Sequence, residues 1–308
     1  MKSNFKFIPA LLVLFAFSTL SFGQKVLVDA NKTYSGISSI EVEGGWLDVT
    51  YTGGSGSEVN VEAYLASNNE KQDIVFVTLG DVLKISYERN SSINTWNDRS
   101  EGFIKITGPI EMELEVKNSS GSIYANNVAA EETNLKVSSG RITANRISGN
   151  LNIHATSGSL MVDGVDGNVE AGVTSGKTDI NDVNGNLNYE STSGSLEANK
   201  VFGEVNVSLT SGNAKLYNIG SLGNLKFTSG NIRAENAGLG PNTRFNGTSG
   251  NFRIQTNSNL SSFNFELKAS SGNLKVGNDS GNKSLIIDQG GSSWVKGSIS
   301  SGNITIEN

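Results

Sequence analysis

The chain has 308 residues with 36 glycines, only 3 prolines, no cysteine and a formal net charge of −6. The lack of cysteine excludes a disulfide framework, a thiolate metal site and a lipid-modified N-terminal cysteine. Net acidity argues against nucleic acid as a partner, because binding to the phosphate backbone needs a positive field. Many glycines with so few prolines exclude a collagen-like chain.

Residues 1–23 have the pattern of a secretory signal peptide. Lys2 and Lys6 precede an apolar run from Ile8 to Leu20, and small residues stand before a cleavage site after Gly23. The run is too short for a comfortable membrane span, which disfavours a retained anchor. Cleavage would remove both lysines and leave a net charge of −8. We therefore expect an exported chain that is not integral to the membrane, in the periplasm, at the cell surface or outside the cell.

Residues 24–117 carry strand signals without a fixed period. Short alternating or apolar runs are separated by Gly, Ser and Asn turns: Ile40–Val42, Leu47–Tyr51, Val59–Val61 and Val82–Tyr87. A repeat protein needs an end that covers its first unpaired strand. The segment is therefore predicted to be a β-rich cap that merges into the repeats through Ile110–Val116, with a loop at Asn90–Gly102.

Residues 118–308 are organised by a repeat. The triplet Ser/Thr-Ser-Gly recurs, and we call its glycine the marker glycine: Gly121, Gly140, Gly158, Gly176, Gly194, Gly212, Gly230, Gly250, Gly272 and Gly302. The spacings are 19, 18, 18, 18, 18, 18, 20, 22 and 30 residues. A fixed period of this size is typical of a solenoid.

Side chains alternate around each marker glycine. Apolar or small residues stand two and four positions after it, as in Leu160 and Val162 or Leu196 and Ala198. Such a period of two predicts a strand with one buried face and excludes a helix. The sequence thus predicts an all-β, single-stranded β-solenoid, similar to a parallel β-helix, with about 18 residues per coil. Leu160, Leu196 and Ile232 should then meet in one core.

Two polar columns follow the same register. Asn and Asp tolerate a left-handed backbone, so the residues five positions after the marker glycine are predicted to turn one corner of the coil: Asn126, Asn145, Asp163, Asn181 and Asn199. The threonines of the triplets are predicted to stack at the opposite corner: Thr156, Thr174, Thr192, Thr210, Thr228 and Thr248.

The last interval, from Gly272 to Gly302, is long enough to allow two arrangements. The coil that contains Gly302 is either an exposed edge of the solenoid or is covered by the 30-residue excursion before it. The repeat pattern does not decide between them.

The layout resembles bacterial putative-adhesin families built of β-strand repeats, including the head-GIN group and related domains of unknown function. The matching residues are the lead-in from Tyr34-Ser35-Gly36-Ile37 to Val49, the segment Ile104–Pro109, and the Ser-Gly-Asn/Ser-Ile/Leu repeats. The resemblance covers nearly the whole chain after the signal peptide. It implies placement in the envelope or at the surface more firmly than it implies adhesion.

Parallel β-helices also include polysaccharide lyases and hydrolases, whose sites need clustered carboxylates on one outward face. The closest pairs are Asp163 with Asp166 and Asp179 with Asp182, but they fall in turns and in different columns. His154 is the only histidine and should face outward. We therefore predict no catalytic residue, no metal site and no cofactor.

One outward column has an unusual charge pattern. Three residues after the marker glycine stand four cations, here called the basic stripe: Lys215, Arg233, Arg253 and Lys275. In sequence order they fall on four successive repeats, where like charges one strand apart repel. The stripe is a candidate site for an anionic surface glycan or an acidic envelope protein. Alternatively, neighbours such as Glu235 neutralise it.

These features predict a non-enzymatic, exported adhesin or cell-envelope structural protein that interacts through a regular solenoid face. The alternative from another class is a carbohydrate-active enzyme of the β-helix type. A groove with several convergent carboxylates would favour the enzyme.

Overall fold

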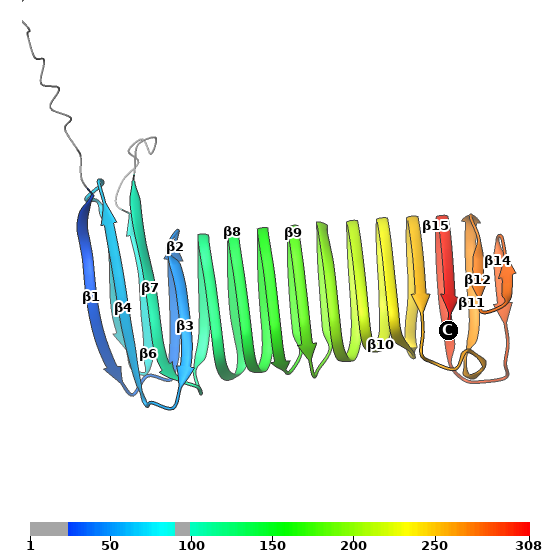
Figure 1. The fold of residues 1–308 in the computed structure, drawn as a ribbon, viewed down its shortest axis with the longest axis horizontal. Coiled ribbons are helices and arrows are strands. Elements are labelled where there is room, and N and C mark those ends of the chain that lie inside the picture. The colour runs from blue at the N-terminus through cyan, green and yellow to red at the C-terminus, as the bar shows by residue number, and fades with distance from the viewer. Residues whose placement is uncertain (1–23, 90–98) are drawn as a thin grey trace, which may run out of the picture.

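A computed structural model describes residues 24–89 and 99–308 and forms a long rod made almost entirely of β-strands (Figure 1). The expected signal peptide, residues 1–23, lies outside the described residues, as does most of the expected loop at Asn90–Gly102. The last three residues of that loop, 100–102, belong instead to a strand.

The described chain contains fifteen strands and one short 3-10 helix. In chain order they are β1 Lys25–Ser35, β2 Ser39–Gly45, β3 Asp48–Gly54, β4 Glu58–Ser67, β5 Gln72–Leu79, β6 Val82–Arg89, β7 Ser100–Pro109, β8 Glu113–Asp166, β9 Val169–Val183, β10 Leu187–Gln255, η1 Leu260–Ser262, β11 Asn264–Ser271, β12 Leu274–Val276, β13 Asp279–Gly281, β14 Ser284–Ile287 and β15 Trp294–Glu307.

The middle of the rod is a stack of parallel coils, traced by the long strands β8, β9 and β10. Leu151 pairs with Val169, and Val169 pairs with Leu187, so partners are 18 residues apart. Extended backbone continues around the coil, which is why β8 spans 54 residues. Backbone pairing with the coils on both sides fixes equivalent side chains in columns.

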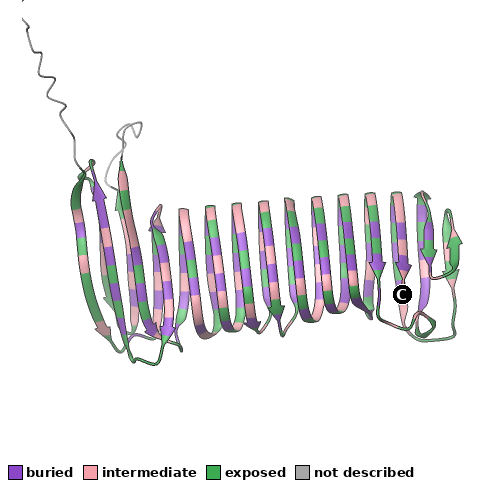
Figure 2. Cartoon of the chain, viewed as in Figure 1, coloured by how far each residue is buried: buried purple, intermediate pink, exposed green. Residues whose placement is uncertain are grey.

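A single apolar core runs along the inside of the rod. Leu160, Leu196 and Ile232 are all buried and belong to one cluster, which confirms the predicted common core. Figure 2 shows the buried bands repeating from coil to coil. Small residues make room for large ones: a Cβ at Gly247 would lie 2.8 Å from the ring of Phe227.

The marker glycines form their own column, and close backbone approach explains the motif. A Cβ added at Gly158, Gly212 or Gly250 would lie 2.0, 1.9 or 1.7 Å from the carbonyl oxygen of the preceding marker glycine. Any side chain there would collide with the neighbouring coil. Gly194 is less crowded by backbone, since its Cβ would lie 3.0 Å from the carbonyl oxygen of Gly176, and its nearest contact, at 2.6 Å, is the side-chain hydroxyl of Ser191.

The predicted left-handed corner is wrong by one residue. Positive φ angles occur six positions after the marker glycine rather than five, at Asn127, Arg146, Gly164, Asp182, Lys200, Asn218 and Asn236. Arg146 and Lys200 show that the coil imposes this conformation on residues that seldom adopt it alone. The Asn and Asp residues predicted for this corner directly precede it in the chain. The threonines predicted to stack are solvent-exposed.

The N-terminal end joins the solenoid through two arms of the sheet. One arm runs β1–β4–β7–β3 and the other β5–β6–β2, and β3 and β2 both pair in parallel with β8. The β1–β4, β4–β7 and β5–β6 pairs are antiparallel. The predicted end of the cap, at residue 117, lies inside strand β8, which begins at Glu113 and continues past this position without a break.

At the C-terminal end, spatial order departs from sequence order. Strand β15, the last in the chain, pairs in parallel with β10 on one side and with β11 and β12 on the other. Figure 1 shows red β15 between yellow β10 and the orange strands. Strands β13 and β14 then pair antiparallel with β12 and β11. Thus the coil of Gly302 is not an exposed edge, and the preceding excursion covers it.

Candidate functional site

The outward face beside the marker glycines is rigidly ordered by an asparagine ladder. The side-chain amide of Asn231 donates to Asn213 at 3.0 Å, that of Asn251 to Asn231 at 2.9 Å, and that of Asn303 to Asn251 at 2.8 Å. The backbone N–H of Asn273 donates to Asn303 at 2.9 Å. These ladders repeat from coil to coil and help to fix the register of β15.

The basic stripe lies two residues further along the same face, and all four of its side chains are exposed. Lys215, Arg233 and Arg253 follow one another on β10. Lys275 is not their immediate neighbour, because Thr305 of the inserted strand pairs with Arg253 on one side and with Lys275 on the other. The expected run of four adjacent cations is therefore three cations, a threonine and a fourth cation.

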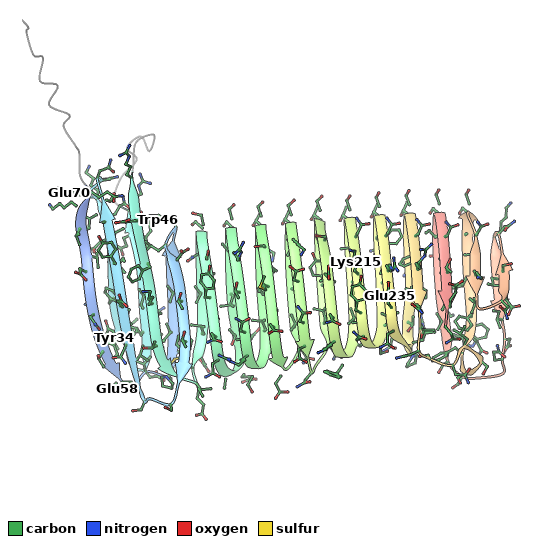
Figure 3. All side chains as sticks on the ribbon, viewed as in Figure 1. Tyr34, Trp46, Glu58, Glu70, Lys215 and Glu235 are labelled. Carbon is green, nitrogen blue, oxygen red and sulfur yellow. The ribbon has the colours of Figure 1, made fainter. Side chains whose placement is uncertain are left out.

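Two glutamates partly neutralise the stripe. Glu235 pairs with Arg233 at 2.5 Å between Oε1 and Nε, and Glu307 pairs with Lys275 at 2.5 Å between Oε1 and Nζ. The hydrogen bond and charge of Lys275, together with the charge of Arg253, lower the pKa of Glu307. Lys215 and Glu235, both labelled in Figure 3, belong to β10, yet neither Lys215 nor Arg253 has an ion pair with the described residues. These two cations are available to a ligand.

A hollow of about 360 Å³ lies at the C-terminal end of the stripe. Its lining includes Arg253, Thr305 and Lys275 as well as the ladder amides of Asn303 and Asn273. Strand insertion alone brings these residues together, since they come from β10, β15 and β12. Sequence reasoning missed Thr305 and Asn303. The signal was present, because both stand at the stripe and ladder positions after Gly302.

The residues considered for catalysis are scattered. Asp179 pairs with Lys177 at 2.9 Å, Asp182 turns a left-handed corner, and the side chain of Asp166 accepts from Asn184 at 3.3 Å. His154 is exposed and points outward. Within residues 24–89 and 99–308, no group of three or more His, Asp or Glu side chains is placed to hold a metal ion.

Comparison with known proteins places the chain in a family. The family model described as Toastrack DUF4097 matches residues 37–201 and again 190–307, which together span most of the chain. The chain belongs to the Toastrack DUF4097 family. No curated protein matches it significantly.

Several solved structures resemble this Toastrack chain at low identity. A putative adhesin from Bacteroides fragilis has 11% identity, covers 92% of this chain and 97% of its own, and has a TM-score of 0.34. A putative adhesin from Parabacteroides merdae has 12% identity with the same coverage and TM-score. A putative lipid binding protein from Parabacteroides distasonis has 13% identity, covers 91% and 97%, and has a TM-score of 0.33.

Across the described parts of the Toastrack chain, no helix is long and apolar enough to span a membrane.

The glutamates beside the stripe lead to a testable expectation. Replacing Glu307 by Gln removes the charge that holds Lys275, so, on the expectation that the stripe takes anionic glycans, heparin-derived oligosaccharides should bind about two- to fivefold more tightly at low ionic strength. Titration calorimetry measures this change. The control, Glu101→Gln, removes the same charge from an exposed site on β7. Equal effects of the two substitutions would show that only net charge matters.

Proposed function

We propose that this Toastrack chain is an exported, non-enzymatic cell-envelope protein of the adhesin type that holds anionic surface glycans on its basic stripe. The observation that carries the proposal is the placement of Lys215, Arg233 and Arg253 on three consecutive coils. Neighbouring coils are about 4.8 Å apart. Glu235 offsets the charge of Arg233, whereas Lys215 and Arg253 on either side of it have no ion pair, and a ligand with regularly spaced sulfate or carboxylate groups would complement this column.

The rigidity of the face supports this role. Paired backbone on both sides and the asparagine ladder hold the cations before a ligand arrives, so binding orders little beyond the long side chains. Export rests on the signal-peptide pattern of residues 1–23, and fractionation of cells tests it. We further propose that coils of about 18 residues stack on an N-terminal cap formed by residues 24–117, which blocks end-to-end association.

The stripe is tested by replacing Arg233 and Arg253 with Ser. The double variant should lose binding to heparin and other anionic glycans while its circular dichroism and melting temperature stay unchanged, because both side chains are exposed. Lys136→Ser with Arg141→Ser removes two exposed cations elsewhere on β8 and serves as the control. Unchanged glycan binding by the Arg233/Arg253 variant would refute the proposal.

A further inference from the structure

A second hollow, of about 620 Å³, lies on the arc of each coil that directly precedes the marker glycine in the chain. We call it the polar groove. It crosses five coils from Asn152 to Asn224, and its outward side chains are Asn152, His154, Glu170, Thr174, Asn188, Glu190, Thr192, Asn206, Ser208, Thr210 and Asn224. Four strand spacings give it a length of about 19 Å.

Gly172 provides a notch in the floor of the groove. It pairs with His154 on one side and with Glu190 on the other, so it is the one position without a side chain in this part of the column. The backbone there does not require glycine, because Gly172 has no left-handed φ. An added Cβ would lie 2.7 Å from Nδ1 of His154, so the imidazole leans over the notch.

Most polar groups of the groove lack protein partners. The side chains of His154, Glu170, Glu190, Thr174, Thr192 and Thr210 make no hydrogen bond or ion pair with the described residues. Asn206 donates to Asn188 at 3.0 Å, which links two neighbouring coils of the groove. The groove thus offers a row of amide, hydroxyl, imidazole and carboxylate groups to a ligand.

The composition of the groove limits the class of ligand. A peptide strand cannot add here, because the backbone of each coil is already paired with its neighbours. The apolar residues below the groove, such as Val173 and Tyr189, are buried, so a protein partner would find no hydrophobic anchor. Glu170 and Glu190 without a lining Lys or Arg disfavour a polyanion.

We propose that the polar groove binds an uncharged, extended oligosaccharide, whose hydroxyl groups match the rows of amides, hydroxyls and carboxylates. Its central sugar would pack on the imidazole of His154 where the ring lies over Gly172, beside Glu190. This site is separate from the basic stripe in position and in ligand class. The Toastrack chain would therefore hold two kinds of glycan on two arcs of one rod.

Titration calorimetry of residues 24–308 with cellohexaose, chitohexaose, maltohexaose and mannohexaose tests the proposal. At least one of these should bind saturably and with little dependence on salt. Gly172→Tyr should weaken that binding at least tenfold by displacing the imidazole of His154 and covering this part of the groove, and Glu190→Ala should weaken it without adding bulk. The proposal would be overturned if none of the four sugars bound, or if both variants bound the sugar as tightly as the unaltered chain does.

Matched measurements separate this site from the stripe. Heparin binding should be unchanged in Gly172→Tyr, and hexasaccharide binding should be unchanged in the Arg233/Arg253 double variant, so each site can fail alone. Melting temperatures establish that the variants are folded. Shorter sugars appearing during incubation would overturn the binding role and indicate glycan cleavage, the alternative that the sequence left open.

Discussion

Deleting residues 294–308 is expected to unfold the C-terminal end of the rod while the coils before it stay folded. Strand β15 pairs with β10 on one side and with β11 and β12 on the other, so its removal leaves a gap one strand wide. Strands β11 to β14 would then have no coil to pack on. Because each coil contacts only its neighbours, the damage should stay local.

The magnitude follows from the apolar side chains that β15 buries. Val295, Ile299, Ile304 and Ile306 are each at most 3% exposed. At about 1.5–3 kcal/mol for each, their burial contributes up to about 6–12 kcal/mol. This is comparable with the whole stability of a typical domain, about 5–15 kcal/mol. Residues 264–287 therefore cannot keep their positions without the inserted strand.

Hydrogen exchange followed by mass spectrometry checks this expectation. Amides of β11 and β12 should lose their protection, and trypsin should cut at Lys268 and Lys275, while β8 and β9 stay protected. A peptide of residues 294–308 added to the truncated chain should restore protection by filling the gap. Unaltered protection of β11 and β12 after the deletion would contradict the observed strand order.

Replacing Gly250 by Ala is expected to destabilise the rod by about 3–5 kcal/mol. The added methyl group would lie 1.7 Å from the carbonyl oxygen of Gly230, and Gly250 has a φ of +141°. The collision and the backbone strain both act at the contact between two coils. Neither can be relieved by moving a flexible side chain, since the group in the way is backbone.

Substitutions at two other glycines provide graded controls. Thermal or urea unfolding measures the stability of all three variants. Gly56→Ala should change stability little, because nothing lies within 4 Å of the added Cβ. Gly194→Ala should fall between them, since its nearest contact is the hydroxyl of Ser191 at 2.6 Å and the carbonyl of Gly176 is 3.0 Å away. Equal losses at Gly56 and Gly250 would contradict the role given to the marker glycines.

The stacked architecture could be predicted because two independent sequence patterns indicate it. The marker glycine permits close approach between coils. The alternation of apolar and polar residues around it assigns each side chain to the core or to the surface. Leu160 and Ile232 are far apart in sequence, yet the period alone placed them in one core. The same period placed Lys215, Arg233 and Arg253 in one outward column.

Strand order at the C-terminal end could not be predicted, because the motif specifies membership of a column and not position along it. The segment Ser301-Gly302-Asn303-Ile304 satisfies the same rules as Ser271-Gly272-Asn273-Leu274, and both fit beside Gly250. Long loops make both orders reachable. The structure places Gly302 next to Gly250 and Gly272 beyond it.

The polar groove was missed for a different reason. His154 was weighed as a single residue, whereas the groove arises from a missing side chain at Gly172 and from polar side chains without protein partners on four coils. The only signal in the sequence is a glycine at an outward position where its column neighbours carry side chains. The error of one residue at the corner has a similar origin, since the geometry of the coil and not residue type selects the left-handed position.

Paired cysteines test the stacking of the coils most directly, because the chain contains no cysteine of its own. Adjacent parallel strands bring equivalent Cα atoms to about 4.8 Å, within reach of a disulfide, whereas a second-neighbour strand is about 9.6 Å away and out of reach. Arg253→Cys with Thr305→Cys should therefore oxidise to an intramolecular disulfide, and Arg253→Cys with Lys275→Cys should not. Ready oxidation of the second pair and none of the first would contradict the inserted strand and the columns built on it.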